Sequence, residues 1–149
     1  MSGFTPRERP SVTVDIVVLS QQEGRHQVLL VQRRKPPFEG YWAIPGGFVE
    51  AYEPLEAAAR RELREETGLE STPLEQMHTF GDPGRDPRGW TISVAHLAVL
   101  SEQEKEAWQP QAGSDASAAG WFDLENLPAL AFDHEQILAH TIKALGLKR

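Results

Sequence analysis

The sequence predicts a mixed α/β fold in which helices flank a β-sheet. Three observations carry this prediction: several short segments alternate or are rich in β-branched residues, two longer segments have the spacing of amphipathic helices, and Gly- and Pro-rich stretches separate them. A chain of 149 residues is long enough to bury a core of its own. We therefore expect one domain over residues 1–149, with residues 1–11 as a flexible lead-in.

The N-terminal part of the chain predicts a hairpin followed by short extended pieces. Val12–Leu19 alternates and is β-branched, which predicts a strand, and Gln27–Arg33 beyond the turn QQEGRH predicts its hairpin partner. Lys35–Gly40 is a loop, and Tyr41–Ile44 and Gly47–Glu50 are extended pieces interrupted by the sequence PGG.

A helix and two strands are expected in the middle of the chain. Pro54 suits the first position of a helix that runs to about Thr67, with Gly68 as the residue that ends it. Leu74–Phe80 and Thr91–Leu100 predict strands on either side of the loop GDPGRDPRG.

The C-terminal part predicts a last strand and a last helix. Residues 101–117 are polar and form a loop or, in part, a short helix, and Ala119–Leu124 predicts a strand. Asp133 with Gln136 has the spacing of a capping box. The apolar residues of the helix that follows are Ile137, Leu138, Ile142 and Leu145.

The composition argues against several classes of function. The 15 basic and 22 acidic residues give a formal net charge of −7, so nucleic acid and anionic membrane surfaces should repel the chain. Its aliphatic runs are far shorter than the roughly 20 residues that cross a bilayer, and the N-terminus lacks the apolar stretch of a secretory signal. The absence of Cys excludes thiolate metal sites and fits a cytoplasmic protein. The five His include no i, i+4 pair, which argues against a zinc site.

The end of the first predicted helix has an unexpected charge pattern. The stretch RRELREETGLE at 60–70, where the helix should end, holds Glu62, Glu65 and Glu66, although a helix C-terminus favours cations. At about 100° per residue, Glu62 and Glu66 fall within about 20° of the core-facing Leu55, with Glu65 beside them. Carboxylates on an inward face repel one another and lose hydration unless a cation joins them. The pattern therefore favours a site for a hard divalent cation, Mg²⁺ or Mn²⁺, over a solvated helix face.

The segment GFVEAYEPLEAAARRELREETGL at residues 47–69 resembles the signature of the Nudix hydrolases. That signature runs Gly, five residues, Glu, seven residues, then Arg-Glu-aliphatic-any-Glu-Glu-any-Gly-aliphatic. Every specified position is filled, by Gly47, Glu53, Arg61, Glu62, Leu63, Glu65, Glu66, Gly68 and Leu69. The resemblance implies a Nudix-type α/β/α sandwich with a mixed sheet between helices.

The resemblance also implies roles for the residues of the signature. The expected catalytic residues and divalent-metal ligands are Glu62, Glu65 and Glu66. Arg61 and Glu53 are expected to pair and fix the loop against the helix, where a surface salt bridge alone contributes little. Gly46 and Gly47 would let the backbone approach substrate phosphate, and Gly47 also the metal, besides forming a tight turn.

The implied reaction is metal-assisted hydrolysis of a nucleoside diphosphate that is linked to a second group. Two or three Mg²⁺ ions on the glutamates would neutralise the diphosphate, lower the pKa of a bound water and stabilise the leaving phosphate. The sequence leaves the general base open between a glutamate of the signature and a carboxylate of the polar segment, which offers Glu102, Glu104, Glu106 and Asp115.

Three segments outside the signature are similar to bacterial ADP-ribose pyrophosphatases: WAIPGGFVE at 42–50, GDPGRDPRG at 81–89 and WFDLENLPALAFDH at 121–134. This similarity implies ADP-ribose as the substrate, with AMP and ribose 5-phosphate as products.

Several side chains outside the signature are candidates for binding this substrate. Arg85 and Arg88 would grip phosphate or ribose oxygens, or would merely offset the neighbouring aspartates at 82 and 86. Arg33 and Arg34 are further candidates. The aromatic side chains considered for stacking on adenine, each of which also suits a core, are Phe38, Trp42, Trp90 and Trp108.

Three alternatives compete with an ADP-ribose hydrolase. One is a Nudix enzyme for another nucleotide, such as a nucleoside triphosphate, NADH or a dinucleoside polyphosphate. Another is an ADP-ribose-sensing regulator, but such regulators add a DNA-binding domain and often have a damaged signature, whereas here the signature is intact. An inert interaction domain would leave the inward glutamates unexplained. The expected partner is a small nucleotide rather than nucleic acid or a membrane, and the resemblance allows a homodimer.

Overall fold

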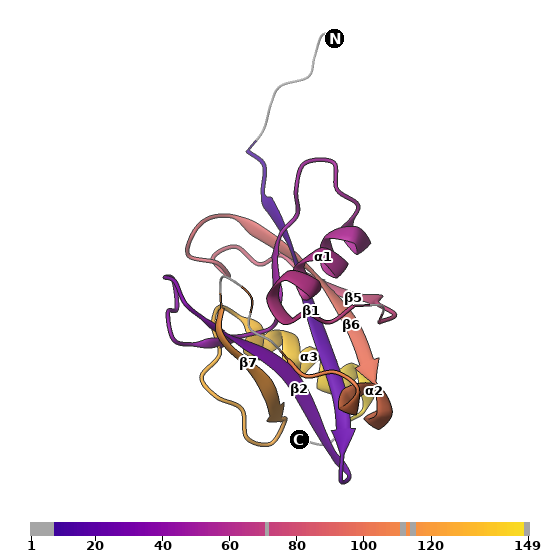
Figure 1. Ribbon diagram of the computed structural model, residues 1–149. Helices are drawn as coiled ribbons and strands as arrows, with labels where there is room; N and C mark the ends of the chain where they lie inside the picture. Colours follow the sequence, from indigo (N-terminus) through magenta and orange to yellow (C-terminus); the bar gives the residue numbers. More distant parts are fainter. Residues whose placement is uncertain (1–7, 71, 111–112, 114–115, 148–149) are drawn as a thin grey trace.

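The computed structural model describes residues 8–70, 72–110, 113 and 116–147, and a mixed β-sheet forms its middle layer (Figure 1). The strands are β1 Ser11–Gln22, β2 Arg25–Arg33, β3 Trp42–Ala43, β4 Gly46–Phe48, β5 Glu75–Phe80, β6 Thr91–Leu100 and β7 Ala116–Asp123. The helices are α1 Leu55–Thr67, α2 Glu102–Glu106 and α3 His134–Leu145. Within the described ranges, no helix is long and apolar enough to cross a membrane.

The sheet is built around β1. Its neighbours follow the order β3-β2-β1-β6-β5, and β1 runs parallel to β6 but antiparallel to β2. The strands β4 and β7 pair antiparallel with β1 and β2, respectively. The expected mixture of parallel and antiparallel pairing is therefore present.

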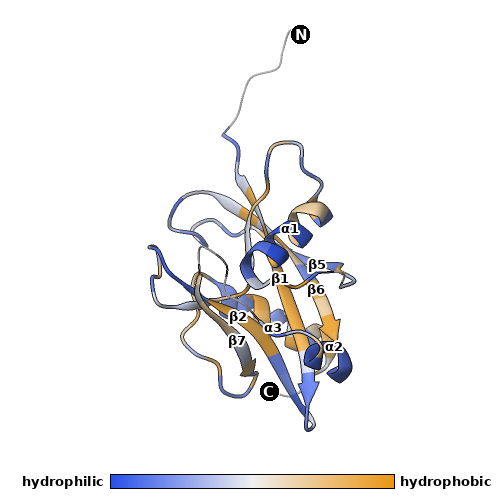
Figure 2. Ribbon diagram, viewed as in Figure 1, coloured by the Kyte–Doolittle hydropathy of each residue, from blue (hydrophilic) through white to orange (hydrophobic). Residues whose placement is uncertain are grey.

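Successive residues of β1 point to two separate cores. Val14, Ile16 and Val18 pack with the buried alanines of α1 in one cluster. Val17 and Leu19 pack with residues of α3 in the other. Because side chains alternate across a strand, α1 and α3 must cover opposite faces of the sheet (Figure 1). Figure 2 shows the hydrophobic colour concentrated on the central strands and the hydrophilic colour on the outer turns of α1.

One edge of β1 changes its partner along its length. Its N-terminal part, Thr13–Asp15, pairs with β4, whereas its C-terminal part, Leu19–Gln22, pairs with β2. The strands β1 and β2 therefore pair only at their hairpin end. A cavity lies where they are not paired, and residues of β1, β2, β3, β4 and α1 line it.

Both ends of α1 lie at or within one residue of the positions predicted from the sequence. Pro54 is the N-cap, with extended backbone at ψ 144°, so the helix begins one residue later than expected. Gly68 ends the helix in the left-handed conformation at φ 80°, and its N–H donates to Arg64 O. The helix end predicted from Gly68 is confirmed.

The C-terminal part of the fold differs from the prediction at β7 and at the start of α3. The strand β7 begins at Ala116 rather than Ala119, and α2 settles the open alternative for the polar segment, since Ser101 and Glu104 form its capping box. The capping box expected at Asp133 and Gln136 is wrong. Asp133 is the N-cap of α3, but its carboxylate makes no capping hydrogen bond because it accepts two from Arg85.

Candidate active site

The cavity beside β1 has a volume of about 560 Å³ and collects most of the residues singled out from the sequence. Its lining includes Arg33, Gly46, Gly47, Arg61, Glu62, Glu65, Glu66, Arg85 and Arg88. The exception among the expected site residues is Glu53, which is not part of the lining but binds Arg61.

Arg61 is the centre of the hydrogen-bond network around the signature glutamates. Its Nε and one Nη donate to the two carboxylate oxygens of Glu53 at 2.7 and 2.9 Å. Its other Nη donates to Glu62 at 2.7 Å and to Glu65 at 3.3 Å. The hydrogen bond from Arg61 lowers the pKa of Glu53 to about 2, and the same bond raises the pKa of Arg61. One guanidinium thus joins the loop before α1 to two of the three glutamates.

Glu62 is more enclosed than Glu65. Its side chain is 14% exposed, against 53% for Glu65. Burial raises the pKa of Glu62, and the Arg61 guanidinium opposes that shift. The carboxylate lies directly against the backbone of β4, since a Cβ added to Gly47 would stand 2.5 Å from Glu62 Cδ. Gly47 is therefore required to be small so that the helix can approach the turn.

Glu66 binds the same turn one residue earlier. Gly46 N–H donates to Glu66 Oε1 at 3.1 Å. Gly46 itself is pressed against β1, because an added Cβ would stand 2.2 Å from Val14 O. The two glycines therefore leave room for different groups: Gly46 for the backbone of β1, and Gly47 for the carboxylate of Glu62.

The carboxylates suit a divalent cation by their chemistry and position. Glu62, Glu65 and Glu66 offer only oxygen donors, which hard cations prefer, and all three line one cavity. Burial, which raises the pKa of Glu62, disfavours its charged form, and a bound cation would offset that cost. Within the part of the chain that the structure describes, no three acidic or histidine side chains already converge on one point. Arg61 and the Gly46 N–H hold these carboxylates instead.

The arginines of the loop 81–89 are both engaged with aspartates. Arg85 is 5% exposed and donates from two nitrogens to Asp133 at 2.6 and 2.9 Å. Arg88 donates from Nε and one Nη to Asp86 at 3.0 and 2.8 Å. Burial raises the pKa of Asp86, but the hydrogen bonds from Arg88 outweigh it and hold the pKa low. Arg88 therefore offsets a neighbouring aspartate, as one alternative from the sequence had it. Arg85 instead binds Asp133 at the start of α3.

The aromatic residues that line the cavity are not those that the sequence suggested for stacking on adenine. Phe48 and Phe132 line it, and Trp42, Trp108, Trp90 and Phe38 do not. Trp42 and Trp108 pack against the two cores. No periodicity distinguishes Phe48 or Phe132, because β4 is too short to show one and Phe132 precedes α3 in a loop.

A buried carboxylate that lines the cavity was also not predicted from the sequence. Asp15 is 6% exposed, accepts a hydrogen bond from Ser93 Oγ, and lies 3.6 Å from His134 Nε2. His134 Nδ1 accepts the Ile44 N–H at 2.9 Å, and burial lowers the pKa of His134. The histidine is therefore neutral, with its proton on Nε2 toward Asp15. The available signal was a single carboxylate within the apolar segment TVDIVVL.

Three of the four carboxylates considered as an external general base lie away from the cavity. Glu102, Glu104 and Glu106 belong to α2, which follows Leu100 at the end of β6. Leu100 pairs with Ser20, whereas the cavity begins at Thr13 and Asp15 near the other end of β1. None of these glutamates lines the cavity. Asp115, the remaining candidate, lies outside the described residues.

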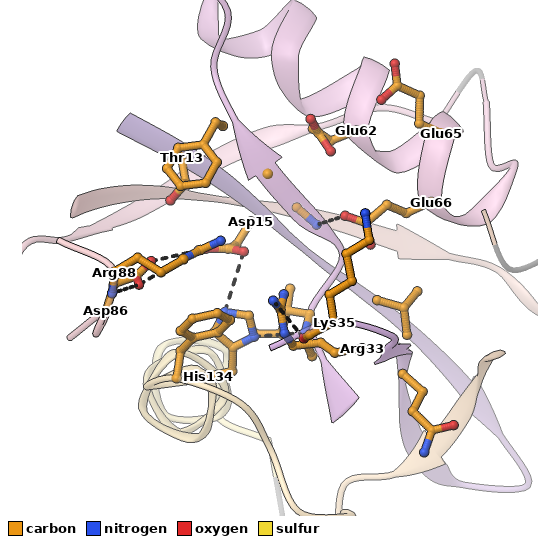
Figure 3. Close-up of a pocket in the computed structure, with 18 of the residues that line it drawn as sticks. Thr13, Asp15, Arg33, Lys35, Glu62, Glu65, Glu66, Asp86, Arg88 and His134 are labelled. Atoms are coloured by element: carbon orange, nitrogen blue, oxygen red, sulfur yellow. Dashed lines mark hydrogen bonds and ion pairs between the residues drawn. The ribbon is translucent and has the colours of Figure 1, made fainter. Parts of the chain in front are cut away.

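Figure 3 shows how the labelled side chains are arranged. Glu62, Glu65 and Glu66 project from α1 on one side, and Arg88 with Asp86 lies on the other, with Asp15 between them. Lys35 and Arg33 reach in from the end of β2 and the loop after it. The three glutamates of α1 and the Arg88–Asp86 pair thus lie on opposite sides of the cavity.

Comparison with known proteins places the chain in a family. The NUDIX domain model matches residues 9–145. The ADP-ribose pyrophosphatase of Methanocaldococcus jannaschii is 43% identical over 129 residues, 87% of this chain and 71% of that protein. The ADPR responsive transcriptional repressor NtrR of Acinetobacter baylyi is 39% identical over 143 residues, and the chain spans 56% of its length.

Solved structures agree with this match. The NUDIX domain of Shewanella oneidensis NrtR, crystallised with ADP ribose, superposes with a TM-score of 0.84 at 33% identity, covering 97% of this chain and 95% of that one. A MutT/nudix family protein from Enterococcus faecalis gives a TM-score of 0.86 at 34% identity, over 97% of this chain and 65% of that one. The predicted α/β sandwich is confirmed. The chain belongs to the Nudix family and is a Nudix pyrophosphohydrolase.

Proposed function

We propose that the protein hydrolyses the diphosphate of ADP-ribose in the presence of Mg²⁺, forming AMP and ribose 5-phosphate. The observation that carries the proposal is the set of three signature glutamates that line one side of a single cavity, into which Arg33 and Lys35 also reach. The M. jannaschii relative is named an ADP-ribose pyrophosphatase, and the S. oneidensis NrtR domain was crystallised with ADP ribose. These likenesses support the choice of substrate.

Glu62, Glu65 and Glu66 would hold Mg²⁺ or Mn²⁺, with Gly47 leaving room for the ion beside the backbone. When bound, the cation neutralises the diphosphate and lowers the pKa of a coordinated water. It also offsets repulsion between an anionic substrate and a chain of net charge −7.

The chain's own residues orient these ligands. Arg61 binds Glu62 and Glu65 from one guanidinium, and its bidentate contact with Glu53 fixes that guanidinium against the loop. The Gly46 N–H donates to Oε1 of Glu66 and so helps to orient that carboxylate at the cavity. A general base among these glutamates is consistent with the structure, because the described carboxylates of α2 lie outside the cavity.

Two positive side chains would guide the anionic substrate. Arg33 and Lys35 line the cavity from the end of β2. Arg33 Nε donates to Pro37 O at 2.8 Å, so the backbone of the loop after β2 holds the guanidinium at the cavity. Such positive groups raise the local concentration of an anion even when the whole chain is acidic.

ADP-ribose sensing without turnover is the second candidate function, because the A. baylyi relative is named an ADPR responsive repressor. The complete glutamate set favours hydrolysis over sensing. In a sensor, ADP-ribose would bind the cavity with little formation of AMP.

A substrate panel with identified products tests the proposal. ADP-ribose, NADH, ATP and a diadenosine polyphosphate are each incubated with the protein and Mg²⁺, and products are separated by ion-exchange chromatography. We expect the highest kcat/KM for ADP-ribose, with AMP and ribose 5-phosphate in equal amounts. Preference for another nucleotide would move the function to a different Nudix substrate. Binding of ADP-ribose without products would favour sensing.

A further inference from the structure

We propose that His134 is a positioning residue for the reaction: through the turn Ile44-Pro45-Gly46 it sets the place of Glu66, one of the expected metal ligands. The inference rests on the proposed function and deepens it. It gives the first residue of α3 a part in aligning a glutamate that belongs to α1.

The turn lies where the chain passes from one strand pairing to another. β3 ends at Ala43 and pairs with β2, whereas β4 begins at Gly46 and pairs with β1. Ile44 therefore falls outside both ladders, although it is only 2% exposed. A buried N–H that lacks an acceptor destabilises a fold, so this residue requires an acceptor from another part of the chain.

Two N–H groups of the turn bind side chains that come from opposite faces of the sheet. Ile44 N–H donates to His134 Nδ1 at 2.9 Å, and Gly46 N–H donates to Glu66 Oε1 at 3.1 Å. Pro45 between them has no N–H. Because α3 and α1 cover opposite faces, the turn connects a helix of one layer to a glutamate of the other. In Figure 3, His134 approaches the cavity from α3 and Glu66 approaches it from α1.

The peptide between Pro45 and Gly46 can transmit a displacement along the turn. Its C=O accepts from Ile16 N–H of β1 at 2.8 Å, and its N–H is the group that binds Glu66. Because a peptide is planar, the C=O and the N–H turn together about the anchor on β1. The ring of Pro45 fixes φ, so the direction of this peptide follows the chain at Ile44. A change in the hydrogen bond to His134 should therefore move the N–H that orients Glu66.

His134 is itself held firmly enough to act in this way. It is 5% exposed, and its backbone N–H donates to Ala131 O at 3.1 Å. Nε2 lies 3.6 Å from Asp15, which also accepts a hydrogen bond from Ser93 Oγ. Burial lowers the pKa of His134, so Nδ1 keeps the lone pair that the Ile44 N–H requires.

The chain before the turn is fixed independently of His134. Trp42 N–H donates to Ala129 O at 3.0 Å, and Ala131 N–H donates to Trp42 O at 2.8 Å. These two hydrogen bonds keep the end of β3 against the segment that precedes α3. Loss of the acceptor at His134 should therefore release the turn beyond Ala43 and leave the rest of the fold in place.

Two substitutions of His134 separate its acceptor from its donor. In His134→Asn the amide oxygen lies as many bonds from Cα as Nδ1 does, so it can accept from Ile44 N–H. In His134→Gln the amide nitrogen takes the place of Nε2 and can donate toward Asp15, but the Ile44 N–H loses its acceptor. His140→Gln is the matched control in the same helix, since His140 stacks on His78 and is outside the cavity lining.

Three measurements are made on each folded variant. Hydrogen exchange of Gly46 N–H, followed by NMR without metal, reports on the turn. The EPR signal of free Mn²⁺ gives the affinity of the glutamates for the ion, and kcat and KM are measured for ADP-ribose.

We expect His134→Gln to speed the exchange of Gly46 N–H. It should also weaken Mn²⁺ binding and lower kcat by about 10- to 100-fold, the usual effect of losing a group that orients a metal ligand, with KM little changed. His134→Asn and His140→Gln should match the wild type in all three measurements.

The wild type provides a further test that requires no substitution. Coupling between two sites is reciprocal, so a His134 that positions Glu66 must in turn be held more firmly when Mg²⁺ binds Glu66. Saturating Mg²⁺ should therefore slow the exchange of Ile44 N–H. An unchanged exchange rate would contradict the inference, whether or not His134→Gln folds.

Two results with the variants would overturn the inference. Equal losses in His134→Asn and His134→Gln would show that the acceptor at Nδ1 is not the feature that matters. A lower unfolding temperature in His134→Gln, without a change in Mn²⁺ affinity or kcat, would limit His134 to stabilising the fold. Failure of the proposed function would be recognised separately, because a wild type that does not hydrolyse ADP-ribose still yields the exchange and Mn²⁺ results.

Discussion

Replacing Gly47 by Ala should reduce turnover strongly while leaving the fold intact. The added methyl carbon would lie 2.5 Å from Glu62 Cδ and Oε2 and 2.7 Å from Oε1. Non-bonded contacts of carbon settle at about 3.5–4.0 Å, so the carboxylate must retreat by about 1 Å. A displacement of that size at a reacting centre costs about 10²-fold in rate. The obstructing atoms are the end of a flexible side chain, so the backbone need not move.

The assay compares three glycine variants by kcat for ADP-ribose hydrolysis and by thermal unfolding. Gly47→Ala should lose about 10²-fold in kcat with little change in unfolding temperature. Gly46→Ala should unfold at a lower temperature, because its Cβ would meet Val14 O and Asp15 Cα at 2.2 and 2.9 Å, which are backbone atoms of β1. Gly120→Ala in β7 is the control, since no heavy atom lies within 4 Å of its added Cβ. Wild-type kcat in a folded Gly47→Ala protein would refute the role given to Glu62.

Three further predictions concern the ion pairs and the buried histidine. Asp133→Asn leaves the buried Arg85 without its counter-charge, so the free energy of unfolding measured in urea should fall by about 3–5 kcal/mol. A change near zero would show that this ion pair does not stabilise the fold. Burial lowers the pKa of His134, so the folded protein binds fewer protons than the unfolded chain and stability falls as the pH drops below about 6.5. The unfolding temperature of His134→Gln should therefore fall less than that of the wild type between pH 7 and 5, and equal slopes would contradict this. The hydrogen bond from Arg61 lowers the pKa of Glu53 to about 2, so the stability that Glu53 contributes is present above about pH 4.5 and is lost toward pH 2. The difference in unfolding free energy between the wild type and Glu53→Gln should therefore shrink as the pH falls over that interval. A constant difference would contradict the pairing of Glu53 with Arg61.

Local patterns in the sequence were sufficient for much of the fold. The alternation in Val12–Leu19 predicted a strand, and Gly68 predicted the end of α1, because both depend on neighbouring residues alone. The helical phase that turned Glu62 toward the interior is also local. The structure confirms it, with a side chain that is 14% exposed.

Features that depend on distant partners were not predictable in this way. The capping box at Asp133 failed because Arg85, 48 residues earlier, takes the carboxylate. Phe48 was not distinguished from the other aromatics, because its exposure follows from the pairing of β4 with β1. The polar contacts between Asp15 and His134 join the first strand to the last helix, and only the isolated charge in an apolar strand pointed to one member of the pair.

In the proposed function, Glu62, Glu65 and Glu66 hold the Mg²⁺ with which ADP-ribose is hydrolysed. The most direct measurement is AMP formation from ADP-ribose by the wild type and by Glu66→Gln, with Mg²⁺ and with EDTA, alongside their unfolding curves. The glutamine retains an oxygen for the Gly46 N–H, so the fold should persist. We expect AMP and ribose 5-phosphate only from the wild type with Mg²⁺. Turnover at the wild-type rate in Glu66→Gln, or in EDTA, would contradict it.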